Sequence, residues 1–185
     1  KGYVIMFTSI QLDALKELGN IGSGNSATSL SIMLNTAVNM EVTQANVLPV
    51  KDCEDLCGVS TGKMFQVIHT ITGDIKGVFW LVMSQEDRSF ISEAVAGDLD
   101  VEESLVVDEE VSNILGASYL RPLADMMNVR ADIDPPSIQG LSDYIKQSDE
   151  IVLDNEHIIF ILNKLQVMDR EVKCYINMIL DSASM

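Results

Sequence analysis

The sequence predicts an α+β fold in which two long helices lie on one face of a largely antiparallel sheet. The first observation is an internal repeat: the motif Glu-x-x-Asn-Ile at residues 17–21 recurs at residues 110–114, 93 residues further along a chain of 185. The second is that both copies fall within helical patterns of apolar residues, and the third is that β-branched and aromatic segments follow each copy. A repeated unit of one helix and several strands is typical of helices that cover one face of an antiparallel sheet. We therefore predict one domain with two pseudo-symmetric halves, of about residues 8–97 and 101–182.

The first half is predicted to begin with an amphipathic helix over residues 11–34. Its apolar face includes the small residues Gly19, Gly22 and Ser26. Small residues lower helix propensity, so their presence on this face predicts a close neighbour, the matching helix of the second half. The remaining elements expected in this half are strands at residues 40–50, 61–72 and 75–83 and a helix at 85–96.

The second half is predicted to begin with a helix of about residues 103–127, reached through an acidic link at residues 98–103. Pro122 lies inside this helix and is expected to interrupt it, because proline lacks the backbone N–H that a helix interior requires. The elements expected after it are a strand at 129–133, a short helix near 141–147, strands at 150–165 and 172–180, and a hairpin turn at 168–170.

The composition excludes several classes of protein. Apolar residues make up 47% of the chain, which is enough for a sizeable core, and 28 acidic against 12 basic residues give a formal charge of −16. This charge repels polyanions, so neither nucleic acid nor an anionic membrane is expected as a partner, and a partner with a basic or metal-bearing surface is favoured. The cleanest apolar runs, at residues 78–83 and 158–162, are far shorter than the roughly 20 residues that cross a bilayer.

The cysteines point to a reducing compartment, with the cytoplasm as the default. Cys53, Cys57 and Cys174 are an odd number in a chain large enough to fold without disulfides. Cys53 and Cys57 could form half of a zinc site, but His69 and His157 are the only histidines and neither has a ligand-like spacing from a third thiol. We therefore expect small buried thiols, structural histidines, and neither a metal nor another cofactor of the protein's own.

The polar face of the repeated helix carries the residues that could do chemistry. Asp13, Glu17, Asn20 and Gly24 fall within about 60° of arc on a helical wheel. A carboxylate and a carboxamide one turn apart can pair with a lysine and orient a water molecule, whereas neither is a good nucleophile. Asparagine is a poor helix former, so its recurrence in mid-helix favours a function. The glycine-rich run at residues 19–25 is not interpreted as a phosphate loop, because no strand precedes it and no Gly-Lys-Ser/Thr closes it.

The stretch of sequence that carries these polar residues resembles a known family. Asp13, Glu17 and Asn20, followed by Ile-Gly-Ser-Gly-Asn-Ser-Ala at residues 21–27, resemble the signature of the CheC/CheX/FliY phosphatases of bacterial and archaeal chemotaxis, and are most similar to CheC. The repeat at residues 110–113 also fits, so the resemblance covers essentially the whole chain as a duplicated unit.

The second copy departs from the first in two places. Val106 stands where the first copy has Asp13, and Pro122 follows the motif. We therefore expect a second site that is less well formed or differently docked.

The resemblance implies hydrolysis of the aspartyl phosphate of a CheY-type response regulator. Glu17 and Glu110 would form salt bridges with a lysine of the regulator, with Asp13 in support. Asn20 and Asn113 would enter the regulator's active site and orient the attacking water. The regulator would supply the phosphoaspartate and Mg²⁺.

Two other functions remain open. The chain could be a non-catalytic adaptor that binds the receptor deamidase CheD or acts like a component of the flagellar switch, although the intact pair of Glu17 and Asn20 argues against a switch-only role. It could also be a structural α+β domain with an accidental repeat, an interpretation that burial of both motif stripes would support.

Overall fold

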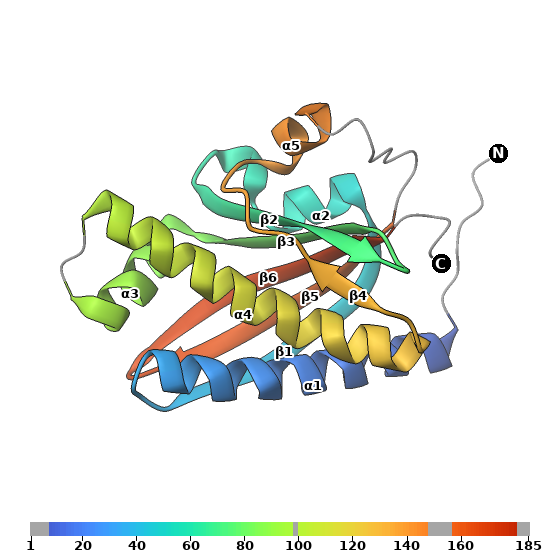
Figure 1. The fold of residues 1–185 in the computed structure, drawn as a ribbon, viewed down its shortest axis with the longest axis horizontal. Helices are drawn as coiled ribbons and strands as arrows, with labels where there is room; N and C mark the ends of the chain where they lie inside the picture. Colours follow the sequence, from blue (N-terminus) through green and yellow to red (C-terminus); the bar gives the residue numbers. More distant parts are fainter. Residues whose placement is uncertain (1–7, 98–99, 148–156, 181–185) are drawn as a thin grey trace.

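The computed structural model describes residues 8–97, 100–147 and 157–180 (Figure 1). The helices and strands of these residues are, in chain order, α1 (Ser9–Met33), β1 (Val38–Pro49), α2 (Val50–Leu56), the 3₁₀ turn η1 (Val59–Thr61), β2 (Met64–Gly73), β3 (Gly77–Ser84), α3 (Gln85–Ala96), α4 (Val101–Met127), β4 (Ala131–Ile133), α5 (Leu141–Gln147), β5 (His157–Val167) and β6 (Arg170–Leu180). The α+β class is therefore confirmed.

The six strands form one sheet in the order β1-β5-β6-β3-β2-β4, and every neighbouring pair is antiparallel. Exchanging β1 with β4, β2 with β5 and β3 with β6 gives the same order read from the opposite edge of the sheet. That is the symmetry expected of a duplicated unit, while the division of the chain into halves at residues 97–101 stays a prediction.

The sheet separates two apolar cores because alternate residues of a strand point to opposite faces. In β3, Phe79 and Leu81 belong to the larger core, which α1, α3 and α4 cover, whereas Val78 and Trp80 belong to the smaller core under α2 and α5. Figure 1 shows α1 and α4 side by side across one face of the sheet, with α2 and α5 beyond β2 and β3. The prediction of two long helices on one face is confirmed.

Both long helices begin at capping boxes. The Thr8 side chain accepts from the backbone N–H of Gln11, Asp100 accepts from that of Glu103, and in each box the third helical residue bonds back to the cap. α4 ends at Met127 and is capped by Asn128, whose left-handed φ of 54° suits asparagine.

The expectation that Pro122 interrupts this helix is wrong. α4 runs from Val101 to Met127 with Pro122 inside. Proline removes one N–H, whose helical acceptor would be the carbonyl of Ser118, but Leu120 and Leu123 on either side are buried in the core and hold the chain in the helical path.

The small residues of α1 do mark close contacts, but with two different neighbours. A Cβ built on Gly22 would lie 2.6 Å from the Tyr119 ring of α4, which confirms the predicted helix neighbour at this position. A Cβ on Gly19 would instead lie 3.1 Å from Val42 in β1. The Tyr119 hydroxyl donates to Asn163 Oδ1 at 2.6 Å, so this one buried ring links α1, α4 and the sheet.

Several element boundaries differ from the sequence-based expectation. The helix α2 was not anticipated, and β2 begins at Met64 because residues 58–62 form a tight turn between Gly58 and Gly62, both with positive φ. The hairpin turn falls on Met168 and Asp169, as expected. The expected start of the fifth strand at residues 150–156 lies outside the described residues.

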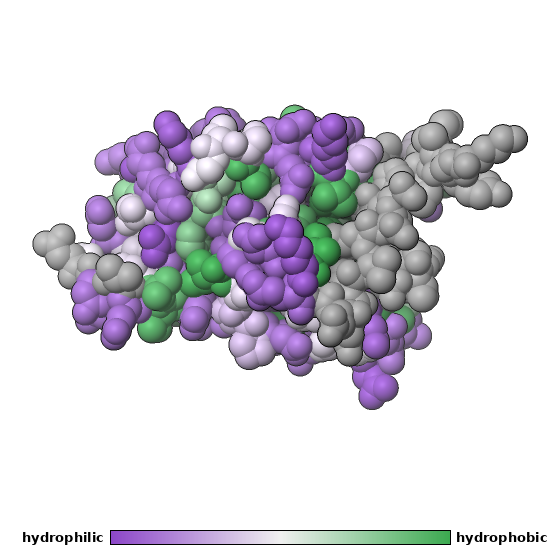
Figure 2. All heavy atoms as spheres, turned by 90° about the horizontal axis from the view of Figure 1, so that it is seen from above, coloured by the Kyte–Doolittle hydropathy of each residue, from purple (hydrophilic) through white to green (hydrophobic). Residues whose placement is uncertain are grey.

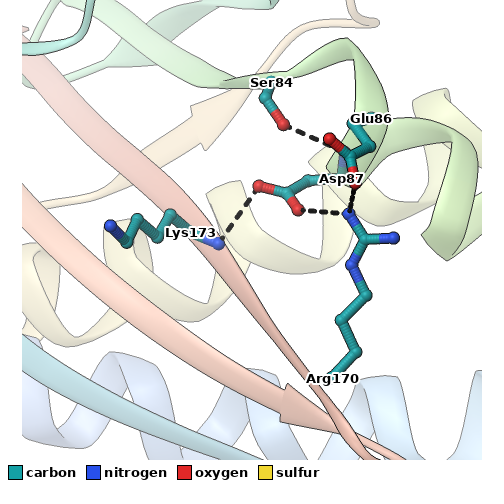
Figure 3. Close-up of polar contacts among 5 residues, drawn as sticks. All are labelled: Ser84, Glu86, Asp87, Arg170 and Lys173. Atoms are coloured by element: carbon teal, nitrogen blue, oxygen red, sulfur yellow. Dashed lines mark hydrogen bonds and ion pairs between the residues drawn. The ribbon is translucent and has the colours of Figure 1, made fainter.

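The helix α3 is fixed to the end of β6 by ion pairs. Arg170 lies 2.9 Å from Glu86 and 3.2 Å from Asp87, and the backbone N–H of Asp87 donates to the hydroxyl of the cap residue Ser84 (Figure 3). The Arg170 guanidinium also lies 4.8 Å from the centre of the Phe90 ring. These contacts join α3 to β6, and none of them involves a residue of α1 or α4.

The surface agrees with the acidic composition. Seen from the side of α5, the protein is mostly hydrophilic, with apolar side chains in smaller separate areas (Figure 2). None of the helices in the described part of the chain is both long and apolar enough to span a bilayer.

Candidate functional site

The structure places both motif pairs on the outer surface of the two long helices. Glu17, Asn20 and Glu110 are exposed, and Asn113 is half-buried. All four lie within unbroken helix, several turns from either end. The burial that a purely structural role would require is therefore absent at Glu17, Asn20 and Glu110 and only partial at Asn113.

The helices α1 and α4 are antiparallel. Equivalent positions in the two helices are therefore displaced along the pair, and the two acid–amide pairs form separate sites. Asn113 lines a hollow together with Thr28 and Ser29 of α1. Thr28 is eight residues beyond Asn20 in the chain, which corresponds to about 12 Å along the helix axis. The two asparagines are thus offset by about 12 Å along the ridge that the two helices form.

Two adjoining hollows follow the junction of the helices. The Asn113 hollow has a volume of about 550 Å³ and contains Glu110 and Asn113 in its lining. The Ile21 hollow, of about 490 Å³, is lined by Leu18, Ile21, Asn25, Arg121, Pro122, Asp125 and Met126. Asn25 and Arg121 line both hollows, so these two residues lie where the hollows adjoin, whereas Glu17 and Asn20 are in the lining of neither.

The turn that carries the second pair is tied to the sheet from beneath. His69 of β2 is buried, and its Nδ1–H donates to the Asp134 carbonyl at 2.9 Å. Its Nε2 then accepts from the Ser112 hydroxyl at 3.0 Å, and Ser112 directly precedes Asn113. Burial lowers the pKa of His69 below its ordinary value, so the ring is neutral near pH 7. A structural role for His69 is confirmed, and this role positions the second motif.

A buried ion pair holds the other side of the same turn. Asp108, two residues before Glu110, is 6% exposed and lies 2.7 Å from Nη2 of Arg88 in α3. Burial raises the pKa of Asp108 while Arg88 opposes that rise. Arg88 also lies 4.8 Å from the centre of the Phe65 ring, so the pair is anchored in the sheet.

The turn that carries the first pair is held by packing and by its own helix. Gly19 and Gly22 bring the backbone onto Val42 and the Tyr119 ring, and the Ser23 hydroxyl donates to the Gly19 carbonyl at 2.7 Å. The predicted supporting residue, Asp13, is exposed and lies 4.0 Å from Lys16, an ion pair too open to fix either side chain.

The cysteines are buried thiols, as expected. Cys53 and Cys57 lie side by side under β6 with their sulfurs 3.9 Å apart, and the Cys53 thiol donates to Asn177 Oδ1 at 2.9 Å. Hydrogen bonding with Cys57 and burial raise the pKa of Cys53, so this thiol is unreactive near neutral pH. Among the described residues, no three His, Cys, Asp or Glu side chains are placed to hold a metal ion.

Sequence reasoning missed the residues that surround the two pairs. Arg121 lies in no motif, and the contacts of His69 and Arg88 with α4 join positions 43 and 20 residues apart. The only available signal was the odd composition of α4, in which Asp108 and Ser112 interrupt its apolar face.

Known proteins share both the motif and the fold. Residues 10–42 match the model of the CheC-like family. Over 136 residues the chain is 31% identical to the CheY-P phosphatase CheC of Bacillus subtilis (strain 168). The match covers 69% of this chain and 65% of that relative, so the chain spans slightly less than two thirds of the relative's length.

Two solved structures have the same fold at lower identity. The X-ray crystal structure of Thermotoga maritima FliY has a TM-score of 0.70 at 20% identity, over 94% of this chain and 91% of that one. A chain of the CheX-CheY-BeF3-Mg²⁺ complex from Borrelia burgdorferi has a TM-score of 0.53 at 18% identity, over 87% and 96%. This chain therefore matches the CheC-like family over residues 10–42, is similar in sequence to CheC over 69% of its length, and shares its fold with FliY and with a chain of the CheX-CheY complex.

Proposed function

We propose that this protein is a phosphatase of the chemotaxis system that hydrolyses the aspartyl phosphate of a CheY-type response regulator. The observation that carries the proposal is the repeated acid–amide pair, presented outward on two stiff helices. The CheC relative, named a CheY-P phosphatase, supports the same activity.

The chemistry suits a protein without a nucleophile of its own. An acyl phosphate is already activated, so a water oxygen attacks phosphorus in line, the bond from phosphorus to the acyl oxygen breaks, and aspartate and inorganic phosphate are released. Mg²⁺ held by the regulator would neutralise charge on the phosphoryl group. What remains for the phosphatase is to place a water molecule, which the carboxamide of Asn20 or Asn113 does by hydrogen bonding.

Each glutamate fixes its asparagine against the regulator. Glu17 and Asn20 are three residues apart, as are Glu110 and Asn113, and side chains at this spacing lie on the same face of a helix. A salt bridge from the glutamate to a regulator lysine therefore sets the depth and orientation at which the asparagine enters. Since the helix itself is anchored in the core, little conformational entropy is lost on docking.

The test follows the decay of a phosphorylated CheY-type regulator in the presence of Mg²⁺. The protein is expected to accelerate this decay, and to leave acetyl phosphate unchanged when the regulator is omitted, because it brings no cation to the reaction. Asn20→Ala and Asn113→Ala, made singly, apportion the rate between the two sites. A regulator that decays at its intrinsic rate with the intact protein present would contradict the proposal.

The same assay also tests the hypothesis that the protein is a non-catalytic adaptor. Binding to CheD without any acceleration of regulator decay would favour the adaptor. The proposed activity also places the protein in the cytoplasm, where the three free and buried thiols would stay reduced.

A further inference from the structure

The surroundings of the second acid–amide pair come from both long helices. The Asn113 hollow is lined by Glu110 and Asn113 of α4 and, from α1, by Asn25, Thr28 and Ser29. Asn25 and Thr28 are exposed. A regulator whose active site is centred on Asn113 therefore also covers part of α1, the helix that carries the first pair.

The part of α1 that lines this hollow is close to the first pair. Asn25 is five residues beyond Asn20, which corresponds to about 7.5 Å along the helix axis. Thr28, which lies across the junction from Asn113, is about 12 Å beyond Asn20 along the same axis. Because the axes of packed helices are about 8–10 Å apart, Asn20 and Asn113 are separated by roughly 15 Å.

A docked regulator needs more room than this separation provides. A specific protein–protein interface covers about 800 Å² on each partner, which is a patch roughly 30 Å across. Two patches of this size with centres roughly 15 Å apart overlap over a large part of their area. Asn25 lies in the overlap, because it lines the hollow at Asn113 and is less than two turns of helix from Asn20.

We propose that the two acid–amide pairs share a footprint that includes Asn25, so that the protein binds one regulator at a time. This inference rests on the proposed function. The repeat then provides one docking surface with two alternative positions for the regulator, and a regulator bound at either pair excludes a second from the other. The affinities of the two positions add, while the stoichiometry stays at one.

The stoichiometry of binding tests the proposal directly. A CheY-type regulator loaded with Mg²⁺ and BeF₃⁻, a stand-in for the phosphoryl group that is not hydrolysed, is titrated into the protein in a calorimeter. Glu17→Lys and Glu110→Lys each remove one docking position, because each sets a cation against the regulator lysine. One regulator per chain is expected for both variants and for the intact protein. Two regulators bound per intact chain would overturn the proposal.

The turnover rate at saturating phosphorylated regulator is an independent measurement. If the two positions exclude each other, the kcat of the intact protein lies between the kcat values of Glu17→Lys and Glu110→Lys. Sites that work independently would instead give an intact kcat equal to the sum of the two values, and this result would contradict the proposal.

The variant Asn25→Trp places a bulky side chain in the shared footprint. It should raise the KM for the phosphorylated regulator about 5-fold or more in both single-site variants. Asn39→Trp is the matched control: Asn39 is exposed on β1, and its neighbours Val38 and Met40 pack in the core beneath α1, so Asn39 points to the other face of the sheet. An effect of Asn25→Trp in only one single-site variant, or an equal effect of Asn39→Trp, would overturn the shared footprint.

Failure of this inference can be told apart from failure of the proposed function. Two bound regulators per chain together with accelerated decay overturn the shared footprint and leave the proposed function standing. An intact protein that leaves the decay of the regulator unchanged refutes the proposed function itself, and the inference with it.

Discussion

Asn20 and Asn113 are costly residues at the positions they occupy. Each lies in the interior of a helix, where alanine is favoured over asparagine by several tenths of a kcal/mol, and neither makes a hydrogen bond that would offset this cost in the described structure. Neither asparagine therefore adds to the stability of its helix.

We predict that Asn20→Ala and Asn113→Ala do not lower the free energy of unfolding and raise it by up to about 0.5 kcal/mol. Urea denaturation followed by circular dichroism measures this quantity. A loss of more than 1 kcal/mol in either variant would mean that the asparagine is part of the fold, and loss of activity could then not be assigned to chemistry.

His69 makes stability depend on pH. Its pKa is lowered in the folded protein by burial, so the unfolded chain binds a proton at a pH where the folded protein does not. Stability should therefore fall as the pH drops through about 6.5, the ordinary pKa of histidine, towards the lower folded value.

Comparison of unfolding curves between pH 7.5 and 5 for the intact protein and His69→Gln isolates this contribution. The variant should be less stable at neutral pH but should show a shallower decline on acidification. Parallel curves for the two proteins would remove His69 as the source of the pH dependence.

The acid–amide stripe could be predicted at the scale of residues because it repeats at one offset and because a helical wheel places it on one face. The contacts that hold these helix turns against the sheet could not be predicted. Ser112 and His69 meet across 43 residues of chain, and nothing in either segment specifies the other. The position of Arg121 beside the two hollows could not be predicted for a different reason. A single arginine on a helix surface is ordinary, and only the structure shows the hollows that it lines.

The junction of α1 and α4 depends on one residue without a side chain. Gly22 lets the backbone of α1 rest on the buried ring of Tyr119, where any Cβ would lie 2.6 Å from a ring carbon. Tyr119 cannot move away cheaply, because its hydroxyl bonds Asn163 inside the sheet. The position of α1 relative to α4 is therefore set where Gly22 meets Tyr119.

We predict that Gly22→Ala destabilises the protein by about 1–3 kcal/mol, because the ring and the helices must separate. Gly24→Ala is the matched control, since a Cβ there meets nothing within 4 Å and the change should stabilise by about 0.5–1 kcal/mol through helix propensity. Both values can be read from thermal or urea unfolding. Equal effects of the two substitutions would contradict the close approach at Gly22.

At the scale of elements, strongly periodic segments were predictable and locally ambiguous ones were not. The helix at residues 85–96 was expected with its exact bounds, because Ser84 caps it and Gly97 ends it. The seven-residue helix α2 lacks a side-chain cap and is too short for periodicity to reveal. Pro122 was misjudged because local propensity predicts a break, whereas packing on both sides keeps the helix continuous.

The two predicted halves are interleaved in the sheet. β1 of the first half pairs with β5 of the second, and β3 pairs with β6, so neither half has a complete sheet of its own. A repeat in the sequence predicts the symmetry of this arrangement but not the strand order, because pairing partners 91 to 129 residues apart leave no local signal.

We therefore predict a single cooperative unfolding transition. Far-ultraviolet circular dichroism and the fluorescence of Trp80, which is buried on the α2 side of the sheet, should report the same urea midpoint. Two separate midpoints would show that the halves are independent folding units, contrary to the interleaved strand order.

The central claim is that two carboxamides on the outer face of one helix pair carry the whole of the hydrolytic acceleration. The most direct measurement is the single-turnover rate of phosphate release from a phosphorylated CheY-type regulator by the double variant Asn20→Ala, Asn113→Ala. We expect this rate to fall about 10²-fold or more, to the regulator's intrinsic rate, while the variant stays fully folded. A folded double variant that releases phosphate as fast as the intact protein would contradict the claim.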